Sequence, residues 1–172
     1  MPNWCSNRAT ISGPAPVIKE ITNILNEENP GLLAWMVPEP KYKGDQDWYH
    51  WRVNNWGTKW DISDVYFEHQ ADEDQIQFSF STAWGPCVEA FHTWAANDGR
   101  VQFTLEYWEP GMAFAGRVSY DGEYLDDDHR DASQDREGYR ELAEEVFGYV
   151  EDEDEEPLTE WYTQGVKDKG LA

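Results

Sequence analysis

Four segments of the chain alternate apolar and polar residues with a period of two, the pattern of strands with one buried face. The clearest is 75–82, where Ile76, Phe78 and Phe80 alternate with glutamine and serine. The same pattern predicts strands over residues 4–12, 62–69 and 101–108. Because the turn Asp72-Glu73-Asp74 separates two of these strands, we expect them to form a β-hairpin.

Two segments instead show the spacing of an amphipathic helix. Within residues 15–27 the apolar positions fall at i, i+4, i+7 and i+8, on one face. A second helix is predicted to begin at Gly85-Pro86, where proline is tolerated, and to end at Asn97-Asp98-Gly99. The resulting order β-α-β-β-α-β predicts an α+β, ferredoxin-like antiparallel sheet with its helices on one face.

The remaining segments fit this pattern less well. Residues 41–61 contain four tryptophans, and we expect an irregular insertion held by aromatic side chains rather than by regular hydrogen bonds. Residues 112–124 can add a strand pair, and residues 137–150 have helical periodicity. The predicted organisation is a ferredoxin-like domain over 1–125, followed by an acidic C-terminal extension over 126–172 that contains this one helix.

Charge restricts the choice of partners. The chain has 35 acidic and 13 basic residues, for a net charge of −22, and residues 121–160 hold eighteen of the acids but three of the bases. Such a surface repels nucleic acid and anionic membranes and attracts basic proteins. We therefore expect a host protein with a basic surface as partner, and neither direct nucleic-acid binding nor membrane binding.

Acidic residues near the predicted C-terminal helix are the first candidates for a binding surface. The run at Asp126 is expected to be a solvated loop, and the glutamates of the helix share a face. The plain interpretation is solubility with partial disorder. The functional hypothesis is that these carboxylates mimic DNA phosphates and inhibit a host nucleic-acid-handling or defence protein. The candidate partner-binding residues are Asp126, Asp127, Asp128, Glu137, Glu141, Glu144 and Glu145.

The tryptophan-rich insertion gives a second hypothesis, from a different class of function. Its rings could form the walls of a pocket in a small-molecule-binding or enzymatic domain, with charged side chains as polar handles. The alternative is an aromatic mini-core that stiffens a long loop. The candidate pocket residues are Arg52, Trp56, Lys59, Trp60, Asp61 and Trp84.

Sequence motifs for catalysis are absent. The chain has no glycine-rich phosphate loop, no H-E-x-x-H and no G-x-S-x-G, so we expect no catalytic residues and no cofactor. Its four histidines show no zinc-type spacing with Cys5 or Cys87, so no metal site is expected and both thiols are predicted to be buried. The N-terminus has no signal-peptide pattern and no apolar run is long enough to span a membrane, which favours a cytoplasmic location. The oligomeric state stays open.

Four strings resemble the YubB-like ferredoxin-fold family of phages, plasmids and prophages. They are Met1-Pro2-Asn3-Trp4-Cys5-Ser6-Asn7, Asn55-Trp56-Gly57-Thr58-Lys59-Trp60-Asp61, Thr82-Ala83-Trp84-Gly85-Pro86 and Glu109-Pro110-Gly111-Met112-Ala113-Phe114-Ala115-Gly116. The resemblance covers about residues 1–125. It implies a mobile-element protein of the bacterial cytoplasm, and it supplies no activity, cofactor or catalytic residue.

Overall fold

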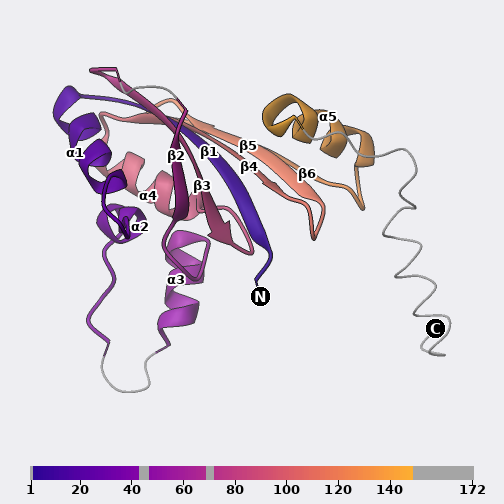
Figure 1. Ribbon diagram of the computed structural model, residues 1–172, viewed down its shortest axis with the longest axis horizontal. Helices are drawn as coiled ribbons and strands as arrows, with labels where there is room; N and C mark the ends of the chain where they lie inside the picture. Colours follow the sequence, from indigo (N-terminus) through magenta and orange to yellow (C-terminus); the bar gives the residue numbers. More distant parts are fainter. Residues whose placement is uncertain (1, 43–46, 69–71, 149–172) are drawn as a thin grey trace.

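A single antiparallel sheet organises the computed structural model, which describes residues 2–42, 47–68 and 72–148 (Figure 1). Its strands lie in the order β2-β3-β1-β4-β5-β6. Each described helix falls short of the length and apolar content that a bilayer-spanning segment requires. The elements in chain order are β1 (Trp4–Ser12), α1 (Ala15–Leu25), α2 (Leu32–Met36), α3 (Trp48–Trp56), β2 (Ser63–Phe67), β3 (Gln75–Ala83), α4 (Val88–Asp98), β4 (Gln102–Glu109), β5 (Phe114–Tyr120), β6 (Leu125–Asp131) and α5 (Arg136–Phe147).

One face of the sheet, which we name the core face, carries the main hydrophobic core. Alternate residues of the central strand β1, such as Ala9 and Ile11, are completely buried on this face. Ile21 of α1 and Phe91 of α4 are buried in the same cluster, so these two helices cover the core face. The alternation in the sequence thus identifies the side of the sheet that the helices shield from water, and the predicted α+β class is confirmed.

The opposite face, which we name the second face, carries a helix of its own. Figure 1 shows α5 across the sheet from α1 and α4. Its buried residues Leu142, Ala143 and Val146 pack in a separate small cluster with Ala115 of β5. The sequence predicted that two helices, now α1 and α4, share one face, and it made no prediction of the face that α5 covers. The apolar stripe of α5 finds cover on the second face because β5 places a small residue there.

Strand β6 corrects the prediction of a solvated loop at Asp126–Asp128. The strand pairs with β5 along its whole length, from Tyr120 opposite Leu125 to Phe114 opposite Asp131. An edge strand tolerates charged side chains because its residues stay in contact with water. The chain thus continues through residue 125 within one sheet. The division into a domain over 1–125 and an extension over 126–172 stays a prediction.

Helix α3 corrects the prediction of an irregular insertion over residues 41–61. Asp47 caps its first turn by accepting a hydrogen bond from the backbone N–H of His50, and Gly57 ends it in the left-handed conformation at φ 85°. The edge-on rings of Trp51 and Trp56, with centroids 5.9 Å apart, provide the expected aromatic packing. Periodicity missed the helix because aromatic residues lie on several of its sides. Residues 43–46 of the insertion lie outside the described residues.

A glycine in β5 lets Tyr107 of β4 reach across to β6. A Cβ atom on Gly116 would lie 2.1 Å from the Tyr107 ring, so no side chain fits beneath that ring. The Tyr107 hydroxyl instead lies 2.9 Å from Nδ1 of His129 and connects to the edge strand. Burial raises the pKa of Tyr107, which keeps this hydroxyl protonated. The Tyr107 side chain of β4 thus crosses β5 and forms a hydrogen bond with β6.

Replacing Gly116 by alanine should destabilise the fold, because the methyl group must displace the Tyr107 ring. We expect a loss of about 1–3 kcal/mol in the free energy of unfolding, measured by denaturant titration. The control is Gly31→Ala, where no atom lies within 4 Å of the added Cβ. Equal stabilities of the two variants would contradict this account of the contact.

Candidate functional site

The four sequence strings that resemble a known family meet at one end of the sheet. The first opens β1, the third follows from the end of β3, and the fourth forms the turn between β4 and β5. Because β1 runs antiparallel to both β3 and β4, its start lies beside the ends of those two strands (Figure 1). The second string ends α3 and leads into the same region. Residues more than a hundred positions apart are therefore neighbours.

Backbone groups lock three of these strings together. The N–H of Trp84 donates to the carbonyl of Asn3 at 2.9 Å, which joins the third string to the first. The hydroxyl of Thr58, 2% exposed, donates to the carbonyl of Ala83 at 2.9 Å and joins the second string to the third. The convergence is thus a hydrogen-bonded structure and more than the proximity of loops.

A buried polar side chain lies beneath this junction. Asn7 is completely buried, and its Nδ2 donates to the Cys5 carbonyl at 2.9 Å and to the Thr82 hydroxyl at 2.8 Å. The Thr82 hydroxyl in turn donates to the carbonyl of Gly85 at 2.7 Å. A buried chain of hydrogen bonds of this kind fixes geometry, because breaking any one leaves a buried polar group unsatisfied.

A buried carboxylate shapes the β4–β5 turn. Glu109, 1% exposed, accepts hydrogen bonds from the backbone N–H groups of Gly111 and Met112, each at 2.7 Å. The turn also closes against the first string, since a Cβ atom on Gly111 would lie 2.6 Å from Nδ2 of Asn3. Both oxygens of this carboxylate accept backbone hydrogen bonds, so Glu109 has a structural role.

Three tryptophans remain at the surface of this junction and form what we name the tryptophan patch, with Trp4, Trp60 and Trp84 around Lys59. Their exposed fractions are 44%, 38% and 43%. The Lys59 ammonium lies 4.1 Å from the ring centre of Trp60 and 5.8 Å from that of Trp84. The rings of Trp4 and Trp60 are 6.1 Å apart. The sequence analysis did not place Trp4 among the candidate site residues. The one indication was that Trp4 lies in the first of the four strings that resemble a known family.

Arg52 and Trp56 do not join the patch. Trp56 is 1% exposed and its indole N–H donates to the carbonyl of Val37 at 2.9 Å. Arg52 forms an ion pair with Glu39 at 2.6 Å, and its guanidinium lies 4.9 Å from the Trp56 ring centre. These two predicted pocket residues instead form the mini-core that the sequence left as the alternative. Lys59, Trp60 and Trp84 do converge.

Asp61 is likewise a structural residue rather than a polar handle for a ligand. Its carboxylate accepts hydrogen bonds from the backbone N–H groups of Leu33 at 2.9 Å and Ala34 at 3.0 Å, at the start of α2. A third comes from the N–H of Ile62 at 2.9 Å. Burial raises the pKa of Asp61, while the three backbone hydrogen bonds oppose that shift. The side chain joins α2 to the chain segment that enters β2.

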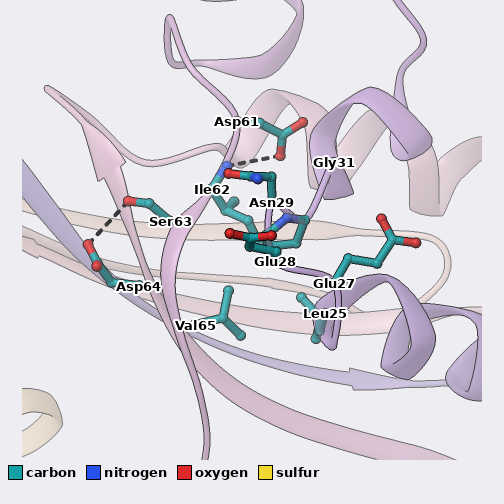
Figure 2. A pocket seen from close by; sticks show the side chains of 11 residues that line it. Leu25, Glu27, Glu28, Asn29, Gly31, Asp61, Ile62, Ser63, Asp64 and Val65 are labelled. Atoms are coloured by element: carbon teal, nitrogen blue, oxygen red, sulfur yellow. Dashed lines mark hydrogen bonds between the residues drawn. The ribbon is translucent and has the colours of Figure 1, made fainter.

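A hollow of about 620 Å³ lies beside Asp61, between the end of α1 and the start of β2. Figure 2 shows Glu27, Glu28 and Asp64 at separate places around it, with Ser63 bonded to Asp64. Among the described residues, no group of three histidine, cysteine or acidic side chains is arranged to hold a metal ion. The hollow is therefore lined by polar side chains, but these do not converge on one point where a ligand or metal ion would bind.

The predicted acidic residues lie on folded elements, and we name the seven together the acidic layer. Asp126, Asp127 and Asp128 belong to β6, and Glu137, Glu141, Glu144 and Glu145 to α5; all seven are exposed. Arg117 neutralises Glu145 at 3.0 Å, and Arg130 pairs with Asp128. These two arginines tie the edges of the layer to the fold.

Both cysteines are free and completely buried. Burial, reinforced by the charge of Glu109, raises the pKa of Cys5 to about 12. Burial also raises the pKa of Cys87 well above its usual value. Thiols with such pKa values hold their protons at neutral pH and are poor nucleophiles. They act as small core residues, as the sequence predicts.

Replacing Asp61 by alanine should destabilise the protein, because the N–H groups at the start of α2 lose their acceptor. The expected loss in the free energy of unfolding is about 1–3 kcal/mol, measured by denaturant titration. Asp72→Ala, a change at an exposed aspartate in the β2–β3 turn, is the control and should have little effect. A stability of the Asp61 variant equal to that of the wild type would show that these hydrogen bonds to the start of α2 are dispensable.

Iodoacetamide should leave both cysteines of the native protein unmodified at neutral pH. Their burial blocks access, and their raised pKa values keep the reactive thiolate scarce. Mass spectrometry should find two alkylated cysteines after treatment in denaturant. Rapid alkylation of either thiol in the native state would contradict its assignment as a buried core residue.

Comparisons with known proteins support the fold and place the chain in a family. Residues 56–159 match the model of the ferredoxin-like domain in Api92-like protein, a segment that runs past residue 125. The crystal structure of protein Api92 from Yersinia pseudotuberculosis matches with a TM-score of 0.55, covering 76% of this chain and 98% of that chain. At 11% identity, this likeness shows the fold alone. None of the curated proteins matches.

The sequence resemblance had predicted an uncharacterised ferredoxin-fold family, and these matches confirm that much. The narrower name YubB-like, and an origin in a phage or plasmid, stay predictions. The matched segment spans more than half of the residues of the chain. This chain belongs to the family of ferredoxin-like domains of Api92-like proteins.

Proposed function

We propose that this chain is a non-catalytic accessory protein of a phage or plasmid, acting in the bacterial cytoplasm. It binds a host nucleic-acid-handling or defence protein through the acidic layer, which occupies a groove that otherwise holds DNA. The observation that carries the proposal is that these carboxylates stand on a strand and a helix of the folded domain. A decoy for DNA needs charges at fixed positions, and a flexible acidic tail would lose entropy on binding.

The attachment of α5 supports a fixed array of charges. Its apolar side is buried on the second face, so the helix cannot rotate about its axis without exposing that side. At its start, Asp135 accepts a hydrogen bond from the N–H of Gly138 at 2.9 Å. Near its end, Arg8 of β1 donates to the carbonyl of Val146 at 2.7 Å. Both ends of the helix are therefore fastened.

The spacing of the glutamates also favours this function. Glu137, Glu141 and Glu144 follow one another at intervals of four and three residues, so they project from one side of the helix. At a rise of about 1.5 Å per residue, neighbouring glutamates of this row are roughly 4.5–6 Å apart along the helix axis. Arg140 lies on the same side of the helix, between Glu137 and Glu144. The exposed glutamates around it can face a basic groove, where charge pairing speeds association and selects the partner.

Neutralising the row should weaken binding to host DNA-binding proteins. The test uses the immobilised chain and the fraction of host protein that is retained on DNA-cellulose. Some of that fraction should bind to the chain and be released by duplex DNA or by salt. The combined change Glu137→Gln, Glu141→Gln and Glu144→Gln should weaken this binding about tenfold, at about 0.5 kcal/mol per charge.

A variant with the same change in net charge serves as the control. Glu27→Gln, Glu28→Gln and Glu73→Gln alters three exposed glutamates away from β6 and α5, and should retain full binding. The proposal fails if nothing from the fraction binds, if duplex DNA does not displace what binds, or if both variants weaken binding equally.

A further inference from the structure

The tryptophan patch is a surface that the acidic layer does not explain. Exposed aromatic side chains are costly to leave in water, and a cluster of them on a soluble protein marks a contact site. Trp4, Trp60 and Trp84 come from three separate strings of the sequence, yet all are 38–44% exposed at the same junction. Tryptophan is also the residue type most enriched among side chains that dominate binding energy.

Backbone strain at Trp84 indicates that its position is imposed by the fold. Its φ of 72° lies in the left-handed region, which bulky residues rarely adopt. The N–H of the same residue is held by the carbonyl of Asn3. Glycine would adopt this conformation without strain. A large, exposed side chain on a strained backbone is the kind of outlier that accompanies binding sites.

Lys59 gives the patch its chemical character. Its ammonium lies over the rings of Trp60 and Trp84, and within the described chain no carboxylate forms an ion pair with it. By contrast, Arg52 and Arg117 are both paired with glutamates. In an acidic protein, a cation held on aromatic rings and away from carboxylates is available to an anionic group of a ligand.

The area of the patch limits the size of what it binds. About two-fifths of the surface of each tryptophan is exposed, and a tryptophan presents about 250 Å², so the three residues offer roughly 300 Å². A stable contact between two globular proteins needs about 800 Å² on each partner. The patch is too small for a dimer of this chain and suits a short segment.

We infer that the tryptophan patch binds a short extended peptide segment in which a proline or aromatic side chain lies next to a carboxylate. The apolar side chain stacks on the exposed rings, and the carboxylate meets the Lys59 ammonium. A peptide is favoured over single-stranded nucleic acid because the net charge of −22 repels a polyanion far more than it repels one carboxylate. The inference does not depend on the proposed role of the acidic layer.

A selection from displayed random short peptides on the immobilised full chain tests the inference. Enriched sequences should carry aspartate or glutamate within two positions of a proline or aromatic residue. Trp60→Ala and Trp84→Gly should each abolish the enrichment, whereas Trp48→Ala should retain it, because Trp48 is equally exposed, at 42%, outside the patch. Trp84→Gly should unfold at a denaturant concentration no lower than the wild type, since glycine relieves the strain.

Binding of one selected peptide and of its counterpart with glutamine in place of the acid then tests the role of Lys59. Lys59→Gln should weaken the binding of the acidic peptide about fivefold and leave the binding of the glutamine peptide unchanged. The inference is overturned by a selection without enrichment, by enriched peptides that lack an acid, by equal effects of Lys59→Gln on both peptides, or by oligothymidylate that binds the patch more tightly than the peptides.

Discussion

Backbone hydrogen bonds tie β1 to β3 on one side and to β4 on the other, and this double pairing determines where the surfaces of the molecule lie. Because side chains alternate along a strand, β1 sends Ala9 and Ile11 into the core and Arg8 to the second face. Arg8 fastens the end of α5, while Trp4 at the start of the strand joins the tryptophan patch. A shift of one residue in the register would exchange all of these positions.

The two faces of the sheet are stabilised in different ways. The core face depends on the burial of large aromatic and branched side chains between the sheet and α1 and α4. The second face combines a small apolar cluster with ion pairs, including Arg117 with Glu106 at 2.7 Å. Such partly exposed pairs contribute little stability each. The pair of Arg117 with Glu145, at 3.0 Å, joins β5 to α5. The acidic layer therefore stands on the more polar side of the domain.

Sequence alone predicted the elements whose pattern is local. Alternation identified β1, β3 and β4, because one face of each is buried in the core. It missed β6, since an edge strand rich in aspartate has no apolar face to detect. It also missed α3, whose aromatic residues lack a single apolar side. In both cases tertiary context decides the structure: a neighbouring strand in the first, and caps with ring packing in the second.

The candidate site shows the same limit. Periodicity cannot show that Asp61 reaches the N–H groups of α2, nearly thirty residues earlier in the chain. The grouping of Lys59, Trp60 and Trp84 was predicted because two of them lie close together in sequence, but the place of Trp4 beside them follows from strand pairing. Resemblance of short strings pointed to the right residues without stating what they share, which is their meeting at one end of the sheet.

Among the described residues β6 is the last strand of the sheet and pairs on one side only, with β5, which has a consequence for the protein at high concentration. A strand with one unpaired side is a template on which another copy could add its own strand, the first step of aggregation. Here such a copy would bring Asp126, Asp127 and Asp128 against an equally acidic strand, and the repulsion between them would oppose the pairing. The same residues that we propose for recognition of a partner would keep the molecules of this protein apart from one another.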